Sequence, residues 1–263
     1  MQQSTKMFRL KRVMVFITLF FSFLMCSKAS AADVKILTYG DSLTAGLKQN
    51  VNGVITCPAG VDAEIGRYPS NDPRVVCYGN GVINKGGYQA VLVDLISGVR
   101  VSPEIINFGY SGIETFQMVN TMGQVFSSQP NVDFILIFGG ANDAYKGRSS
   151  GTVVTNLSLI VDEAKRLGIV PVITTVTRNS GNSSADFYAD RYSSAIKMYA
   201  SANNILLADA RNIMYSNWNS FNSGDGLHLN ASGDNALANV YFNVLGITMP
   251  NHFPIPALLL LLD

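Results

Sequence analysis

Histidine and cysteine are scarce in this sequence, with two and three copies among 263 residues. A catalytic zinc site usually takes two or three His, Glu or Cys ligands at clustered spacing, and the sequence has no such cluster. It also lacks the glycine-rich loop with a following lysine that cradles phosphate groups. These absences argue against a metal-dependent hydrolase and against a phosphate-loop protein, and we expect no metal and no cofactor.

Charged residues are also few, at 14% of the chain. Five of the 19 basic residues lie in positions 1–31, which hold no acidic residue, so 14 basic and 18 acidic side chains follow, a net charge of about −4. The sequence therefore gives no reason to expect nucleic acid or an anionic membrane surface as a partner.

The first 31 residues have the organisation of a secretory signal peptide. Basic residues from Lys6 to Arg12 precede the apolar run Val13–Met25, and Ala-Ser-Ala at 29–31 forms a cleavage pattern. A retained anchor is the alternative, but this run is short for a bilayer span of about 20 residues. A lipoprotein is disfavoured because Met25 stands where a small residue should precede Cys26. We expect cleavage, a secreted or periplasmic protein, and no stable membrane span.

The remaining chain is long enough for one domain with a substantial core, which we place at 32–250 and expect to be monomeric. An insertion at 48–86, rich in Gly, Asn and Pro, contains Cys57 and Cys77. Disulfides persist in exported proteins, so we expect these two cysteines to pair, with two unpaired thiols as the alternative. An apolar tail of unknown role follows at 251–263.

Short apolar runs alternate with longer segments of helical period, which is typical of a parallel sheet covered by helices. The strands are expected at Val34–Tyr39, Glu104–Phe108, Phe134–Phe138, Val170–Val176 and Ile205–Ala208. The helices are expected at Gly87–Val99, Thr115–Phe126, Thr152–Leu167, Ala185–Ala202 and Ala231–Leu245. Ligands bind at the carboxyl ends of the strands in such sheets, so the residues that follow each strand are the first candidates for a site.

Ser42 follows the first predicted strand, in a segment that begins with Gly40 and Asp41 and ends with Leu43. A serine at the entry to a helix exposes its hydroxyl at the edge of the sheet, and its own amide can donate to a developing oxyanion. This position is suited to a nucleophile. The alternative is an ordinary helix cap, a role in which serine and aspartate are common.

Candidate oxyanion donors follow the second and third predicted strands. Gly112 ends a glycine-containing segment where the backbone can approach a ligand closely, so its amide is one candidate. Asn142, which precedes Asp143, offers a side-chain amide that donates without changing charge. The alternative for both segments is an ordinary turn.

Asp225 and His228 lie three residues apart near the end of the domain. A carboxylate that fixes the imidazole tautomer and steadies the imidazolium is what the base of a serine nucleophile requires. A solvated surface histidine is the alternative. The other histidine, His252, has no acidic neighbour in sequence and we treat it as incidental.

Ser149 competes with Ser42, because residues 147–151 satisfy the G-x-S-x-G spelling of a nucleophile elbow. That motif needs a strand immediately before the serine, whereas the nearest predicted strand ends about ten residues earlier. We therefore favour Ser42.

Together, these segments resemble the GDSL, or SGNH, hydrolases. The resemblance rests on residues 40–43, 107–112, 140–143 and 225–228, and so runs over nearly the whole mature chain. It implies a flavodoxin-like three-layer α/β/α sandwich with a central parallel sheet of about five strands.

The resemblance also implies a function. Ser42 would be the nucleophile, His228 the base and Asp225 its partner, with the Ser42 and Gly112 amides and the Asn142 side chain as the oxyanion hole. The family hydrolyses acyl and aryl esters, lysophospholipids and acetylated sugars, so we expect a small-molecule, lipid or carbohydrate ester as substrate. An acyltransferase to a sugar acceptor, using the same serine, and a non-catalytic carbohydrate-binding relative are the alternatives.

Overall fold

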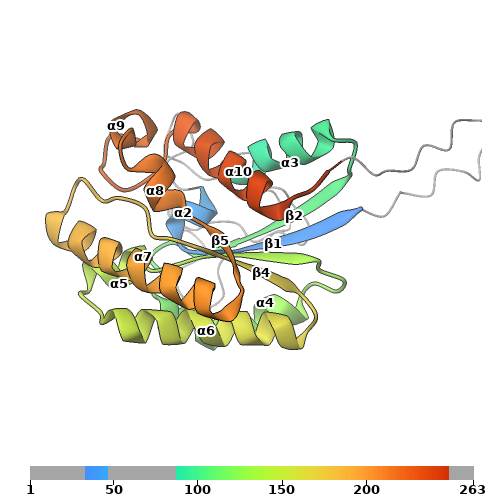
Figure 1. Ribbon diagram of the computed structural model, residues 1–263, viewed down its shortest axis with the longest axis horizontal. Coiled ribbons are helices and arrows are strands. Elements are labelled where there is room, and N and C mark those ends of the chain that lie inside the picture. Colours follow the sequence, from blue (N-terminus) through green and yellow to red (C-terminus); the bar gives the residue numbers. More distant parts are fainter. Residues whose placement is uncertain (1–32, 47–86, 249–263) are drawn as a thin grey trace, which may run out of the picture. The chain divides into compact units, whose positions relative to one another are not determined.

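Parallel strands make the central sheet of the computed structural model, which describes residues 33–46 and 87–248 (Figure 1). Within these residues, five strands lie in the order β2-β1-β3-β4-β5. Their bounds are β1 Val34–Gly40, β2 Pro103–Gly109, β3 Phe134–Phe138, β4 Val170–Thr174 and β5 Leu206–Ala208. The first strand thus lies between the second and third, and the topology switches direction at β1. Ligand sites in open parallel sheets lie at the carboxyl ends of the strands beside such a switch.

Helices cover both faces of the sheet (Figure 1). On one face α3 packs on α10 and β2, while on the other α6 packs between α4 and α7. The helices are α2 Ser42–Ala45, α3 Tyr88–Gly98, α4 Thr115–Ser127, α5 Ala141–Tyr145, α6 Ser150–Arg166, α7 Ser183–Asn203, α8 Ala210–Met214, α9 Trp218–Phe221 and α10 Ala231–Leu245. Because both faces are covered, the central strands are apolar along almost their whole length, as in β3 with the sequence Phe-Ile-Leu-Ile-Phe.

The three-layer α/β/α fold expected from the sequence is confirmed, and each predicted strand and long helix is present. Only their ends differ, because side-chain caps set the helix starts. The side chain of Asn182 accepts a hydrogen bond from the Ala185 amide, so α7 begins at Ser183. Strand β4 ends at Thr174, two residues before the predicted end, where its partner Ala208 is the last residue of β5.

Several predictions from the sequence lie outside the described residues. These are the signal peptide at 1–31, the insertion at 48–86 with Cys57 and Cys77, and the tail at 251–263. In the part of the chain that the structure describes, no helix is both long enough and apolar enough to cross a membrane.

Candidate active site

Two glycines allow α2 to lie against the neighbouring strands. A side chain at Gly40 would overlap the carbonyl oxygen of Phe138 on β3, and a side chain at Gly109 would overlap the backbone of Ala45 in α2. Backbone can approach backbone this closely only where no Cβ intervenes. The position of Ser42, the first residue of α2, is therefore set by the strands on either side of β1.

Asp41 is the N-cap of α2. Its Oδ1 accepts a hydrogen bond of 3.0 Å from the Leu43 amide. The side chain is completely buried, and this burial raises the pKa of Asp41 to about 7, although the hydrogen bond from Leu43 favours the ionised form. The aspartate of the first motif thus shapes the turn that presents Ser42.

Gln89, on α3, holds α2 from the opposite side. Its buried amide nitrogen donates to the Thr44 carbonyl at 2.6 Å and to Thr38 Oγ1 at 3.2 Å. Sequence reasoning missed this residue. The available signal was a polar side chain in the mostly apolar first half of α3.

The structure brings His228 and Asp225 together with Ser42. His228 Nε2 lies 2.9 Å from Ser42 Oγ, and His228 Nδ1 lies 2.6 Å from Asp225 Oδ2. With a carboxylate at Nδ1, that nitrogen carries the proton and Nε2 presents its lone pair to the serine hydroxyl. The geometry therefore suits removal of the serine proton by the imidazole.

The loop that carries the histidine is fixed by its own hydrogen bonds. Asp225 Oδ1 accepts from the amides of Leu227 and His228, both at 2.9 Å, so the carboxylate is oriented before it meets the ring. Asn222 Oδ1 accepts from the Gly224 and Gly226 amides, and its Nδ2 donates to the His228 carbonyl at 3.1 Å. Sequence reasoning missed Asn222, because an asparagine in a polar loop has no distinctive pattern beyond its turn propensity.

The two candidate oxyanion donors follow β2 and β3, the strands that flank β1. Gly40 pairs with Gly109 on β2 and with Phe138 on β3, so the segments carrying Gly112 and Asn142 leave the sheet on either side of Ser42. Asn142 Nδ2 donates to the Ile113 carbonyl at 3.0 Å, which uses one of its two hydrogens and orients the other. Gly112 adopts φ 76°, a conformation that favours glycine.

Asp143 ties these two segments together. Its carboxylate accepts hydrogen bonds from the Thr115 amide at 2.9 Å and the Thr115 hydroxyl at 2.7 Å, so it joins α5 to the first residue of α4. Burial raises the pKa of Asp143, and the two bonds from Thr115 oppose that rise. A second contact joins the same two segments, since Arg148, just after α5, donates from Nε to Oε2 of Glu114, just before α4, at 2.8 Å. Asp143 therefore has a structural role, because it links α5 to the start of α4.

Ser149 is far from a strand and serves as a helix cap. It is the N-cap of α6, and its hydroxyl oxygen accepts from the Thr152 amide at 3.0 Å. His252 lies outside the described residues. Among the described residues, no three His, Cys, Asp or Glu side chains come together in a group that could hold a metal ion.

The site contains a serine hydroxyl in contact with an imidazole, which in turn contacts a carboxylate, at the carboxyl edge of a parallel sheet. This is the side-chain arrangement of serine hydrolases. The chain belongs to the GDSL-like lipase/acylhydrolase family, whose model matches residues 38–236. The resemblance seen in the sequence is therefore confirmed, and the protein is a carboxylic ester hydrolase. No curated protein matches the chain significantly.

Solved structures with the same fold include other esterases. The chain is similar to the acetylxylan esterase Axe2 from Geobacillus stearothermophilus, with 19% identity, a TM-score of 0.63, and coverage of 82% of this chain and 95% of Axe2. It is also similar to a lipolytic G-D-S-L family protein from Veillonella parvula, with 18% identity, a TM-score of 0.59, and coverage of 80% and 97%. A third is LAE5, an α/β hydrolase from the metagenome of Lake Arreo, with 20% identity, a TM-score of 0.63, and coverage of 82% and 97%. At these identities the likeness establishes the fold.

Proposed function

We propose that Ser42 is the nucleophile of this ester hydrolase, with His228 as general base and Asp225 as the carboxylate that orients it. The observation that carries the proposal is the continuous chain of contacts, 2.9 Å from Ser42 to His228 and 2.6 Å from His228 to Asp225. His228 takes the hydroxyl proton as Ser42 Oγ bonds to the ester carbonyl carbon. The proton then passes to the leaving alcohol, and water hydrolyses the acyl-enzyme with the same base.

The oxyanion of the tetrahedral intermediate would be held by three donors, the amides of Ser42 and Gly112 and the side chain of Asn142. These three groups lie in the segments that follow β1, β2 and β3, which are neighbours in the sheet, and this placement supports the role. Each donor contributes about 3 kcal/mol of transition-state stabilisation in comparable sites.

Acetylated carbohydrates are the substrate class we propose. Support comes from the acetylxylan esterase among the similar structures, which the chain matches over 95% of that esterase's length. Two further structures of that enzyme are of catalytic mutants in which a serine and an aspartate are each replaced by alanine, which is consistent with a serine and an aspartate in the roles proposed for Ser42 and Asp225.

The test is labelling with a fluorophosphonate probe followed by peptide mapping, together with turnover of p-nitrophenyl esters of increasing acyl length. We expect label on Ser42, loss of turnover in Ser42→Ala, and turnover close to wild type in the control Ser149→Ala. Full turnover in Ser42→Ala would overturn the assignment. Release of acetate from acetylated xylan, compared with release of longer acyl groups, tests the substrate class.

An acyltransferase would use the same Ser42 intermediate and differ only in the acceptor. Its product would be an acylated sugar whose formation depends on added acceptor, and a mass spectrum of the products distinguishes the two reactions. A non-catalytic relative would show neither label nor turnover.

Export and the disulfide remain part of the proposal. We propose that the protein is secreted or periplasmic after cleavage behind residue 31, and that Cys57 pairs with Cys77. Sequencing of the mature N-terminus tests the first, and a mass shift on reduction and alkylation tests the second. Free thiols in the exported protein would contradict the pairing.

A further inference from the structure

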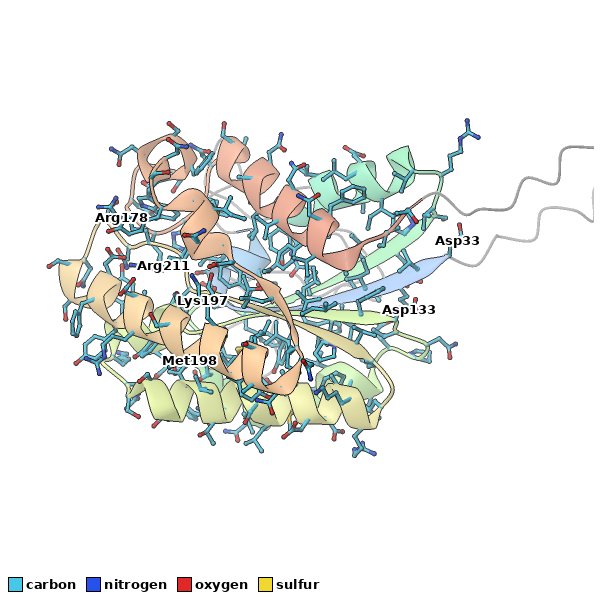
Figure 2. All side chains as sticks on the ribbon, in the orientation of Figure 1. Asp33, Asp133, Arg178, Lys197, Met198 and Arg211 are labelled. Carbon is cyan, nitrogen blue, oxygen red and sulfur yellow. The ribbon has the colours of Figure 1, made fainter. Side chains whose placement is uncertain are left out.

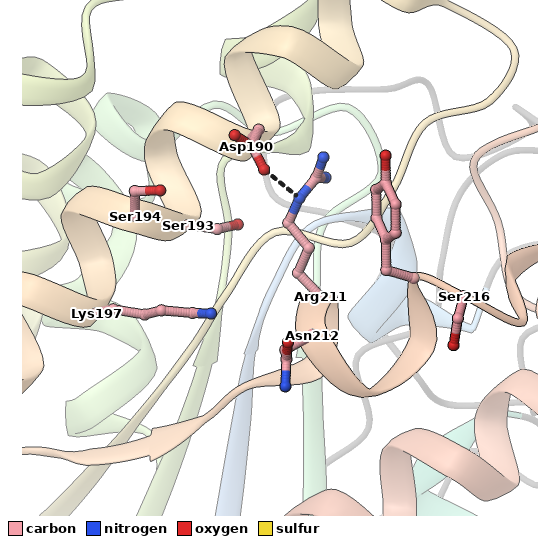
Figure 3. A pocket seen from close by; sticks show the side chains of 8 residues that line it. Asp190, Ser193, Ser194, Lys197, Arg211, Asn212 and Ser216 are labelled. Carbon is pink, nitrogen blue, oxygen red and sulfur yellow. Dashed lines mark hydrogen bonds and ion pairs between the residues drawn. The ribbon is translucent and has the colours of Figure 1, made fainter.

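A polar groove separates α7 from α8, away from the residues that hold Ser42. It has a volume of about 370 Å³. Figure 2 places Arg178, Arg211 and Lys197 beside these two helices, and Figure 3 shows the side chains that line the groove. They are Asp190, Ser193, Ser194, Lys197, Arg211, Asn212, Tyr215 and Ser216.

Every positive charge in the lining already has a carboxylate partner. Arg211 Nε lies 3.1 Å from Asp190 Oδ1, and Arg211 Nη2 lies 3.0 Å from Asp186 Oδ1. Lys197 Nζ lies 2.7 Å from Asp209 Oδ2. An anionic ligand would have to compete with these carboxylates, so the groove does not favour phosphate or a carboxylic acid.

Several polar side chains that line the groove can form further hydrogen bonds. Lys197 has two further donors, and Asp190 uses one carboxylate oxygen in its pair with Arg211. Ser194, Asn212 and Ser216 are exposed and line the groove, and none of their side chains makes a hydrogen bond within residues 33–46 and 87–248. The lining thus mixes hydrogen-bond donors and acceptors, and both of its basic side chains are paired with carboxylates.

Tyr215 adds an aromatic surface. The residue is 45% exposed, although Arg178 Cζ and Arg211 Cζ lie over its ring at 4.7 and 5.3 Å from the centroid and cover part of the ring. Arg211 is itself anchored, since its Nη1 donates to the Thr177 carbonyl at 3.2 Å. These contacts hold the Tyr215 ring in place and leave its exposed part available, which reduces the ordering that binding requires.

We propose that this groove binds an uncharged sugar unit of a carbohydrate chain. A sugar presents apolar C–H groups that pack against an aromatic side chain and hydroxyls that both donate and accept, which fits the exposed part of Tyr215 and the mixed polar lining. The volume lies at the small end of the range of about 300–1,000 Å³ for small-molecule sites, which suits one sugar unit and its links. The choice of carbohydrate rests on the proposed function, whereas the site itself is separate from Ser42.

The test uses full-length Ser42→Ala protein titrated with xylotetraose by calorimetry and by NMR. We expect saturable binding that falls at least tenfold in Tyr215→Ala and in Ser194→Trp, which fills the groove. Phe187→Ala is the matched control, because Phe187 is an exposed aromatic on α7 with Arg191 packed on its ring and lies outside the lining. The control should bind like the parent.

Several outcomes would overturn the proposal. These are absence of xylotetraose binding, binding unchanged in both groove variants, or stronger binding of inorganic phosphate than of the sugar. Ser194 is exposed, so Ser194→Trp reports on the groove even if Tyr215→Ala fails to fold. Hydrolysis of p-nitrophenyl acetate by the wild-type chain is measured separately, so failure of the proposed esterase reaction and failure of sugar binding are distinguishable.

Discussion

Replacing Asp143 with alanine removes both hydrogen bonds that join α5 to the start of α4. The Thr115 amide and hydroxyl, which donate to the carboxylate at 2.9 and 2.7 Å, would be left buried without this acceptor. Each buried group that loses its partner destabilises a fold by about 1–3 kcal/mol. We expect the free energy of unfolding to fall by about 2–6 kcal/mol from the two groups together.

The same substitution should lower kcat. Asn142 is the preceding residue in α5, and its side chain donates to the carbonyl of Ile113, two residues before Thr115, the partner of Asp143. Loss of one oxyanion donor lowers kcat by about 10²- to 10³-fold in comparable enzymes. Asp143 acts only by positioning the donors, so we expect a fall of about 10- to 100-fold in kcat with little change in KM.

Urea denaturation and steady-state turnover of p-nitrophenyl acetate measure the two effects. Thr115→Ser is the control that keeps both hydrogen bonds, and Thr115→Val removes the hydroxyl bond alone and should have a smaller effect on both quantities. Stability that falls as expected, with kcat within about twofold of wild type, would refute a positioning role for Asp143 and leave it a purely structural tie.

Three further perturbations test the site and its support. Gly40→Ala places a methyl group against a carbonyl of β3; kcat should fall at least about 100-fold through displacement of α2, and unchanged turnover would show that α2 has room to move. Asp225→Asn removes the carboxylate that fixes the His228 tautomer, so kcat at neutral pH should fall by about 10⁴-fold, and a fall below tenfold would contradict that role. Burial raises the pKa of Asp234 to about 7 from an ordinary value of 3.8, so the folded state retains a proton that the unfolded chain has released. The free energy of unfolding should therefore fall as pH rises from about 4 to 7, and since Asp41 has the same shift, Asp234→Asn should remove about half of that slope in urea titrations.

The residues that meet in the site were predictable for two reasons. Ser42, Gly112 and Asn142 each follow a predicted strand, and Asp225 and His228 lie three residues apart in one polar loop. An apolar run predicts β1, the topology of a parallel sheet places its carboxyl end beside those of β2 and β3, and this locates Ser42, Gly112 and Asn142 near one another. The strand order itself was implied only by the resemblance, since apolar runs alone leave several orders open.

The short helices were not predictable from periodicity. Helix α2 has four residues and α5 has five, too few to show a repeat of 3.6. Tertiary contacts form them: Gln89 holds the Thr44 carbonyl of α2, and Asp143 holds α5 to Thr115. Such partners are 28 to 45 residues apart in sequence and leave no local pattern.

The bond between Ser42 and His228 joins residues 186 positions apart, so two elements must be placed independently. The sheet places Ser42. The histidine loop is shaped by Asp225 and reaches the sheet through the segment after β4, where the Ser180 amide donates to the Gly226 carbonyl at 2.9 Å. A side chain at Gly226 would overlap the backbone of Gly181. This glycine between the acid and the base therefore sets how far the loop extends from β4, and hence whether the imidazole reaches the serine hydroxyl at all.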